Sequence, residues 1–150
     1  EFNELRTAEQ GYIEIKFTGF NAGDKVVDPE REYSTGKTNG DKFANLKAQA
    51  TWGFADRVKN TYMALEHGYE FEEDELISFD SETIAPEMLE EFVSEMSRIL
   101  RDTDNNGRDK VESKKDLSKR GIPSPNLFDG GVMVYAPTVQ PPSSMSLMFG

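Results

Sequence analysis

An aspartate that follows a basic segment is the feature of this sequence best suited to chemistry on phosphates. Asp129 ends a Pro-Ser-Pro-Asn-Leu-Phe-Asp run near the expected start of a helix. Directly before it lies the basic patch of the chain, where six basic residues stand against three acids between Arg108 and Arg120. Hydrolysis of a phosphodiester needs such an arrangement, with a metal-binding acid beside phosphate-binding bases. A solvated charged turn is the alternative interpretation of the same residues.

The overall charge argues against a stand-alone, non-specific DNA-binding protein. The 150 residues carry a formal net charge of −11, whereas non-specific DNA binding relies on basic patches. Much of the negative charge lies between Glu66 and Asp102, where thirteen acids stand against two arginines. The absence of cysteine excludes disulfides, thiolate nucleophiles and cysteine-based zinc sites. No apolar run approaches the roughly 18 residues of a membrane span, so we expect a soluble, cytosolic protein with no membrane partner.

Two further candidate sites have simpler structural explanations. His67 is the only histidine, and its place beside Gly68 at a predicted helix end favours a partly exposed structural histidine over a catalytic one. The run from Asp102 to Gly107 has oxygen ligands at positions 1, 3 and 5 and glycine at position 6, as in a calcium loop. Position 12 is Ser113 instead of glutamate, so a helix-to-strand turn is favoured there.

The apolar pattern predicts two long amphipathic helices. The first covers residues 43–65 and ends at His67-Gly68, a C-terminal glycine signal. Its apolar stripe recurs at steps of three and four residues: Phe43, Leu46, Ala50, Phe54, Val58, Tyr62 and Leu65. The second begins at Pro86, which suits a first helical position, and ends near Arg101.

Shorter elements are predicted on both sides of these helices. Residues 1–10 are expected to form a helix, residues 12–17 a strand, and Thr18 to Lys42 a long loop. Lys110 to Lys114 predicts a strand, and Ser124-Pro125 is expected to open the final helix as N-cap and first-turn proline. Two glycines, 130 and 131, lie inside that helix at a cost of roughly 1 kcal/mol each relative to alanine. Either the helix frays there or something packs closely against its backbone.

The order of these features resembles the nuclease domain of the large terminase subunit of tailed phages. That family carries a Ser-Lys motif, a Lys-Arg-Gly turn and then Ser-Pro-Asn/Asp-Leu-Ala-Asp. Here the corresponding residues are Ser113-Lys114, Lys119-Arg120-Gly121 and Ser124 to Asp129. A start containing Phe-Asn-Ala-Gly, within Ile13 to Gly23, and a Lys-Ala-Gln-x-x-Trp helix, at Lys47 to Trp52, also match. The resemblance therefore covers most of the chain.

The resemblance implies an α/β protein with a ribonuclease H-like nuclease fold, whose central sheet carries three acids that hold two divalent metals. Two metals about 4 Å apart stabilise the attacking water and the leaving oxygen of a phosphodiester. Mg²⁺ or Mn²⁺ suits this role, and such hard cations need carboxylate oxygens. By resemblance, Asp129 is a catalytic metal ligand, and Lys114 is a catalytic residue near the scissile phosphate or an orienter of the acids.

The resemblance also suggests which residues contact DNA. Lys115, Lys119 and Arg120 are expected to bind the DNA backbone, and Glu112 is a weaker candidate for a supporting acid. Asp129 has a structural alternative, because an aspartate in a first helical turn complements the helix dipole.

The first strands of the family's sheet, with two of its three acids, would lie upstream of Glu1. We therefore expect a partial ribonuclease H-like nuclease domain over residues 1–136, with a long loop at 24–42, and a flexible tail over residues 137–150. One carboxylate cannot usefully hold two Mg²⁺ ions, so the chain alone is expected to be at most weakly active.

The implied function is part of a viral DNA-packaging terminase, an endonuclease that cuts concatemeric phage DNA in the host cytoplasm. Its implied partners are double-stranded viral DNA, the portal protein and the small terminase subunit. The alternative is a non-catalytic interaction module that docks on the portal or other packaging subunits through its acidic surface and apolar tail. A calcium-binding module at Asp102 to Ser113 is a third possibility.

Overall fold

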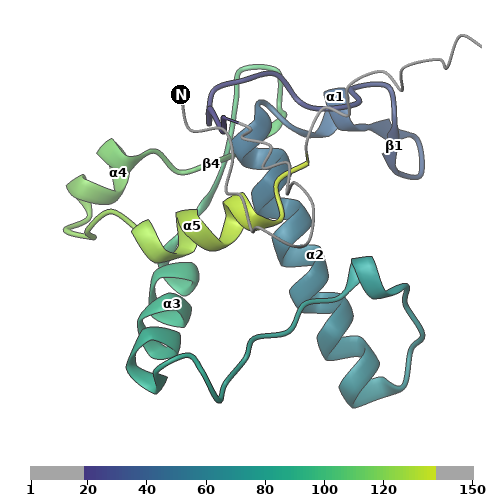
Figure 1. The fold of residues 1–150 in the computed structure, drawn as a ribbon. Helices are drawn as coiled ribbons and strands as arrows, with labels where there is room; N and C mark the ends of the chain where they lie inside the picture. The colour runs from purple at the N-terminus through teal and green to yellow at the C-terminus, as the bar shows by residue number, and fades with distance from the viewer. Residues whose placement is uncertain (1–18, 138–150) are drawn as a thin grey trace, which may run out of the picture.

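The computed structural model describes residues 19–137, which form a mixed arrangement of helices and two small sheets (Figure 1). The helices are α1 (Asn39–Lys42), α2 (Leu46–His67), α3 (Pro86–Arg98), α4 (Lys114–Lys119) and α5 (Asn126–Val134), with a 3₁₀ turn, η1, at Glu73–Glu75. One antiparallel sheet pairs β1 (Glu32–Ser34) with β2 (Lys37–Thr38), and the other pairs β3 (Arg101–Thr103) with β4 (Asp109–Val111). The predicted helix at residues 1–10, the predicted strand at 12–17 and the tail beyond residue 137 lie outside the described residues.

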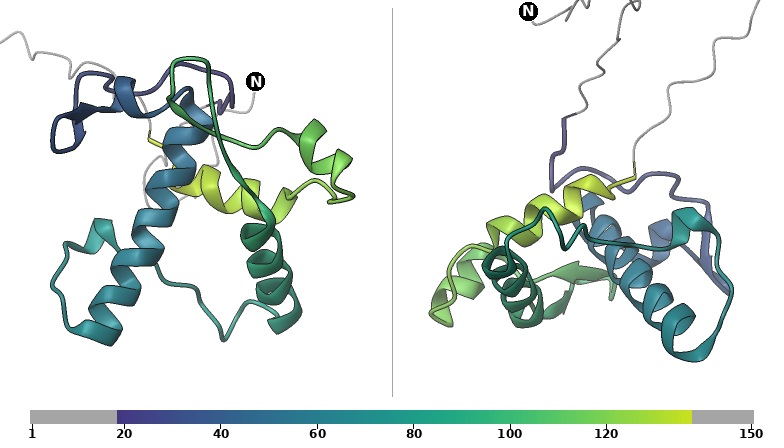
Figure 2. Two further views of the ribbon diagram at one scale, coloured as in Figure 1. Left: turned by 180° about the vertical axis from the view of Figure 1, so that it is seen from behind. Right: turned by 60° about the horizontal axis from the view of Figure 1, so that its bottom comes forward.

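Helix α2 is the long axis on which the other elements assemble. Figures 1 and 2 show α5 crossing its N-terminal half, with α3 beside α5, while the C-terminal half and η1 extend away from α5. The predicted helix over residues 43–65 is confirmed, but it begins at Leu46. Asn45 is the N-cap, and its side chain accepts a hydrogen bond from the backbone N–H of Ala48 at 2.9 Å. The helix therefore begins after this capping residue, although the apolar stripe already starts at Phe43. Gly68 closes the helix with a φ of 69°, as predicted.

The predicted long loop at Thr18 to Lys42 is wrong for its second half, which contains β1, β2 and α1. Gly36, with a φ of 74°, makes the turn between the two strands. Thr38 then starts α1 through a reciprocal cap with Asp41, in which each side chain bonds the other residue's backbone N–H. These signals are local and polar, so a search for apolar periodicity misses them.

The basic segment before Asp129 is a helix, where a strand end and a turn were expected. The predicted strand at Lys110 to Lys114 is shifted, because β4 ends at Val111. Ser113 then caps α4, and its hydroxyl accepts a hydrogen bond from the backbone N–H of Asp116 at 3.1 Å. The helix predicted to end near Arg101 also stops earlier, at Arg98, since Arg101 begins β3.

The loop compared with a calcium site connects two strands. Residues 104–108 turn the chain between β3 and β4. The predicted helix-to-strand turn is therefore wrong in one respect, because a strand and not a helix comes before the turn. The Asp104 carboxylate accepts hydrogen bonds from the backbone N–H groups of Asn106 and Arg108, and it pairs with the Arg108 guanidinium. These bonds satisfy the carboxylate inside the hairpin. Among residues 19–137, no helix combines the length and apolarity that a membrane crossing requires.

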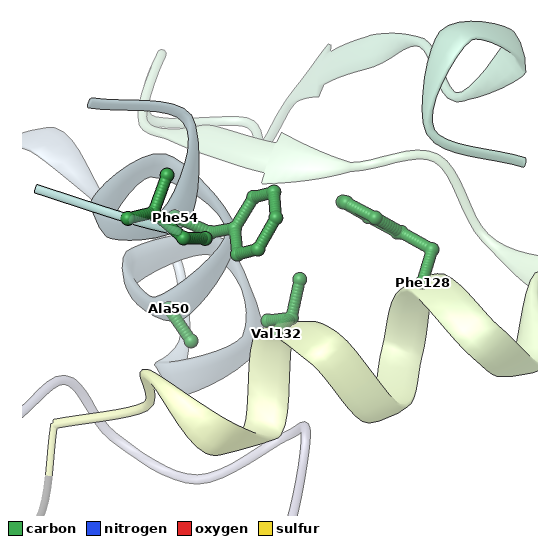
Figure 3. Packing of buried hydrophobic residues seen from close by; sticks show 5 residues of the cluster. Ala50, Phe54, Phe128 and Val132 are labelled. Atoms are coloured by element: carbon green, nitrogen blue, oxygen red, sulfur yellow. The ribbon is translucent and has the colours of Figure 1, made fainter. Parts of the chain in front are cut away.

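The core lies where α5 crosses α2. Figure 3 shows Phe54 and Phe128 directed toward one another, with Val132 beneath them and Ala50 beside them. The ring of Phe54 meets those of Phe128 and Phe92 edge-on, at 5.8 Å between centroids in both cases. Edge-to-face pairs of this kind contribute about 0.5–1.5 kcal/mol each beyond the area they bury. The aromatic contacts therefore hold three helices in a fixed relation.

The two adjacent glycines of α5 have different surroundings. A Cβ atom at Gly131 would lie 2.6 Å from Cε2 and 2.9 Å from Cζ of Phe92, whereas one at Gly130 would meet nothing within 4 Å. The Phe92 ring is packed against the rings of Phe54, Phe79 and Phe128, so it cannot move away freely. The close packing that the sequence left open is therefore present at Gly131 only, and the helix continues through both glycines.

This difference gives a matched pair of substitutions. We expect Gly131→Ala to destabilise the protein by about 1–2 kcal/mol, because overpacking outweighs the better helix propensity of alanine. Gly130→Ala should stabilise it by about 0.5–1 kcal/mol. Denaturant unfolding of both variants measures the difference. Equal effects would contradict the assigned contact with Phe92.

A buried acid attaches the second hairpin to the connection between α1 and α2. Asp109 is 1% exposed, and its carboxylate pairs with the Lys42 ammonium at 2.8 Å and the Arg101 guanidinium at 2.6 Å. Its backbone carbonyl accepts a hydrogen bond from the N–H of Ala44 at 2.8 Å. Burial raises the pKa of the Asp109 carboxyl, but hydrogen bonds and charge from Lys42 and Arg101 outweigh it, so the pKa lies below its ordinary value.

Asp109 should therefore contribute to stability in a pH-dependent manner. Because its folded-state pKa is lowered, its contribution is fully present above the ordinary aspartate pKa of about 4 and is lost as the pH falls through the folded value. At pH 7 we expect Asp109→Asn to cost about 2 kcal/mol, less than the 3–5 kcal/mol of a fully buried pair because Arg101 is exposed. The cost should shrink below about pH 4.

Unfolding measured from pH 3 to pH 7 tests this. Asp102→Asn is the control, since Asp102 forms an exposed pair with Lys110 on the same hairpin. That substitution should cost less than about 1 kcal/mol. A pH-independent cost for Asp109→Asn would contradict the charge-based explanation.

Candidate functional site

The carboxylate of Asp129 lies between two ammonium groups from distant parts of the chain. Its Oδ1 is 2.8 Å from Nζ of Lys47 on α2, and its Oδ2 is 3.2 Å from Nζ of Lys114 on α4. The Asp129 side chain is 12% exposed, so this is a largely desolvated acid at the edge of the core. The structure thus brings together Asp129 and Lys114, the two residues predicted to be catalytic, and adds Lys47.

The first turn of α2 fixes the backbone of Lys47. The N–H of Leu46 donates to the carbonyl of Asp24 at 2.8 Å, and the N–H of Lys47 donates to the carbonyl of Ala22 at 3.2 Å. These donors have no partner inside the helix, so the Asn21 to Asp24 turn supplies partners that the helix lacks. Two of the family-like segments, Phe-Asn-Ala-Gly and Lys-Ala-Gln-x-x-Trp, therefore meet in space.

The first turn of α5 places Asp129. No side chain within α5 caps its start, where Pro125 is the N-cap, and the predicted N-cap Ser124 bonds the Asn126 side chain instead. Glu95 of α3 acts as the cap: its carboxylate accepts a hydrogen bond from the backbone N–H of Phe128 at 2.8 Å. A carboxylate at a helix N-terminus also complements the helix dipole, which applies to both Glu95 and Asp129. The acids of α3 are thus not all solvated surface.

Lys114 is held less tightly than Lys47. Its side chain is 59% exposed, against 20% for Lys47, and it is the first residue of the short helix α4. Lys47 follows a capped start in a 22-residue helix. The two lysines therefore differ in freedom although they contact the same carboxylate.

The other residues with predicted roles lie along or beside α4. Arg120 pairs with the buried carboxylate of Glu112 and donates to the backbone carbonyl of Arg98 at 3.2 Å. Lys119 pairs with Asp116 at 2.6 Å, and Lys115 is exposed. Glu112, the weaker candidate for a supporting acid, is thus bound by Arg120, whereas Asp129 is bound by two lysines.

Sequence reasoning missed Lys47. In the sequence, Lys47 stands out only as part of the Lys-Ala-Gln-x-x-Trp helix. Nothing local connects it with an aspartate 82 positions away. One signal was available: Lys47 lies at the start of a capped helix, where its ammonium can reach past the helix end. That signal does not identify Asp129 as the partner of Lys47.

A carboxylate such as that of Asp129 is the kind of hard oxygen ligand that a divalent cation prefers. In this structure both of its oxygens are paired with lysine ammonium groups. Across residues 19–137, however, no cluster of three or more acidic, histidine or cysteine side chains is present. A complete site for two metals therefore needs ligands from elsewhere.

Comparison with solved structures reveals the relationship. The nuclease domain of the large terminase subunit gp2 of bacterial virus Sf6 is 36% identical, with a TM-score of 0.74, over 80% of this chain and 53% of that one. The chain is a relative of that terminase nuclease domain. The resemblance inferred from sequence is confirmed. A lysine-to-alanine mutant of the same viral domain with manganese and beta-thujaplicinol gives 35% identity and a TM-score of 0.76, over 81% of this chain and 54% of that one.

The same mutant domain was also solved with calcium, at 35% identity and a TM-score of 0.73. This chain spans about half the length of the viral domains it matches. Comparisons with protein-family models and with curated proteins found no match.

The contact between α3 and α5 gives a testable consequence for the site. We expect Glu95→Ala to destabilise the protein by about 1 kcal/mol, the usual effect of losing a helix cap. Glu91→Ala, one turn earlier at an exposed position of α3, should change stability by less than about 0.5 kcal/mol. Thermal unfolding of the two variants makes the comparison, and equal values would argue against Glu95 as the cap of α5.

Proposed function

We propose that this chain is the C-terminal part of a terminase nuclease domain with a ribonuclease H-like fold, acting in the metal-dependent cleavage of concatemeric phage DNA. The observation that carries the proposal is the Asp129 carboxylate held between Lys47 and Lys114, in a chain 36% identical to a terminase nuclease domain. The site combines an acid for a cation with bases for a phosphate.

Asp129 is the residue that would hold a Mg²⁺ or Mn²⁺ ion in this chain. Bound divalent metals supply Lewis-acid stabilisation of the charge that develops on the phosphodiester oxygens. The chain's own lysines orient the acid and neutralise negative charge. Lys47 holds the carboxylate, and the exposed Lys114 is placed to bind a phosphate oxygen of the scissile group.

The remaining bases of α4 are suited to the DNA backbone. Lys115 and Lys119 are exposed, and Arg120 retains part of its surface while bound to Glu112. Positive groups along one short helix give non-specific phosphate contacts, which position a duplex without reading its sequence. The partners proposed for the whole protein are double-stranded viral DNA, the portal protein and the small terminase subunit, in the host cytoplasm.

The match covers about half of the viral domains, so catalysis is proposed for the complete domain. The other metal ligands would come from the part of the domain that this chain does not cover. For the same reason the 150-residue chain is expected to be at most weakly active.

The test is plasmid cleavage in Mn²⁺ by the complete protein and its Asp129→Asn variant. Loss of a residue that hydrogen-bonds a metal ligand typically costs about 10–100-fold in activity, so loss of a direct ligand should lower cleavage by at least about 100-fold. Glu91→Gln, an exposed α3 acid, is the control and should cleave normally.

Undiminished cleavage by Asp129→Asn would refute the proposed role. Equal loss in both variants would point to an unspecific effect of charge. Thermal unfolding of each variant shows whether a loss of cleavage reflects a loss of folding.

A further inference from the structure

We propose that the two lysines on Asp129 have different roles: Lys47 is a positioning residue that stays on the carboxylate, whereas Lys114 is an exchangeable partner that leaves it. This inference rests on the proposed function, because it concerns what happens at Asp129 when a divalent cation arrives. Lys47 carries no predicted role in the sequence analysis.

The two ammonium groups differ in their freedom to move. Lys47 is 20% exposed and lies 2.8 Å from Oδ1, whereas Lys114 is 59% exposed and lies 3.2 Å from Oδ2. The contact of Lys47 also satisfies hydrogen-bond geometry. An ion pair of a well-exposed lysine is typically worth less than about 1 kcal/mol, so it exchanges easily.

The two lysines also differ in how their backbones are anchored. Lys47 begins a long helix whose first N–H groups are bound by Asp24, Ala22 and Asn45. Lys114 begins helix α4, which is also capped at its start, by Ser113, but has only six residues against the 22 of α2. Movement of Lys114 disturbs less of the structure than movement of Lys47.

Asp129 has two carboxylate oxygens, and the two lysines occupy one each. If Lys114 leaves Oδ2, that oxygen becomes available to a cation while Lys47 still fixes the orientation of the carboxylate through Oδ1. Lys114 is then free to contact a phosphate oxygen of DNA. The arrangement thus couples the opening of a metal position to the release of a phosphate-binding group.

The experiment uses the complete protein with its lysines carrying ¹³C-methyl labels, and Mg²⁺ alone as the probe. Asp129→Asn first identifies the two signals, because it should shift those of Lys47 and Lys114 and leave that of Lys59, an exposed lysine of α2, unchanged. In the unsubstituted protein, Mg²⁺ should then move the Lys114 signal to its position in Asp129→Asn. The Lys47 signal should not move to the position that it has in Asp129→Asn.

Mn²⁺ affinity gives a second readout that does not depend on cleavage. Lys114→Met should raise the affinity about two- to five-fold, the size expected from removing one exposed competing ion pair. Lys47→Met should lower the affinity, since the carboxylate it oriented becomes free to turn away, and Lys47→Arg should restore it. Lys59→Met removes one charge from α2 without touching Asp129 and should change nothing.

The outcomes separate the inference from the proposed function. Equal gains in Mn²⁺ affinity for Lys47→Met and Lys114→Met, or release of both signals by Mg²⁺, would overturn the division of roles while supporting a metal at Asp129. Metal binding that is unaffected by Asp129→Asn, or no binding at all, would overturn the proposed function and the exchange together.

Discussion

The crossing of α5 over α2 is the contact on which the site depends. Phe54 of α2 and Phe128 of α5 meet edge-on in the core. The residue after Phe128 is Asp129, and two turns before Phe54 lies Lys47. Once the rings are packed, the carboxylate and the ammonium are brought to the same place at the edge of that core. Gly131 permits this approach, because any side chain there would collide with Phe92. The same packing that stabilises the fold therefore sets the geometry of the acid.

Lys114, the third member of the cluster, is positioned by a different set of contacts. Asp109 fixes the second hairpin to the connection before α2 through Lys42, Arg101 and the N–H of Ala44. The strand that begins at Asp109 leads within five residues to Lys114. The location of Lys114 is thus determined by a polar network, whereas that of Lys47 is determined by apolar packing. This explains how one carboxylate has one well-anchored partner and one exposed partner.

The sequence predicted the parts of this structure that follow from local periodicity and from a family motif. The two long helices and the glycine end at Gly68 belong to this group, and the family motif singled out Asp129 and Lys114, which the structure brings into contact. The first hairpin and α1 were missed because capping and turn residues are weaker signals than an apolar stripe. Helix α4 was missed because Ser113, a strong N-cap, was assigned to a strand. Lys47 was missed for a more general reason: contacts between residues 82 positions apart depend on how helices pack, and periodicity does not encode that.

Charge explains why a complete metal site needs more than the described residues. Asp129 contributes one negative charge, and its two lysine partners contribute two positive charges, so the cluster carries a net charge of about +1. A positive cluster suits a phosphate better than a divalent cation. Two further carboxylates, as the family resemblance implies, would bring the balance to about −1, and release of Lys114 would lower it further. The excess of lysine around Asp129 therefore sets a condition on the proposed metal role: acids from the rest of a complete nuclease domain would have to offset it.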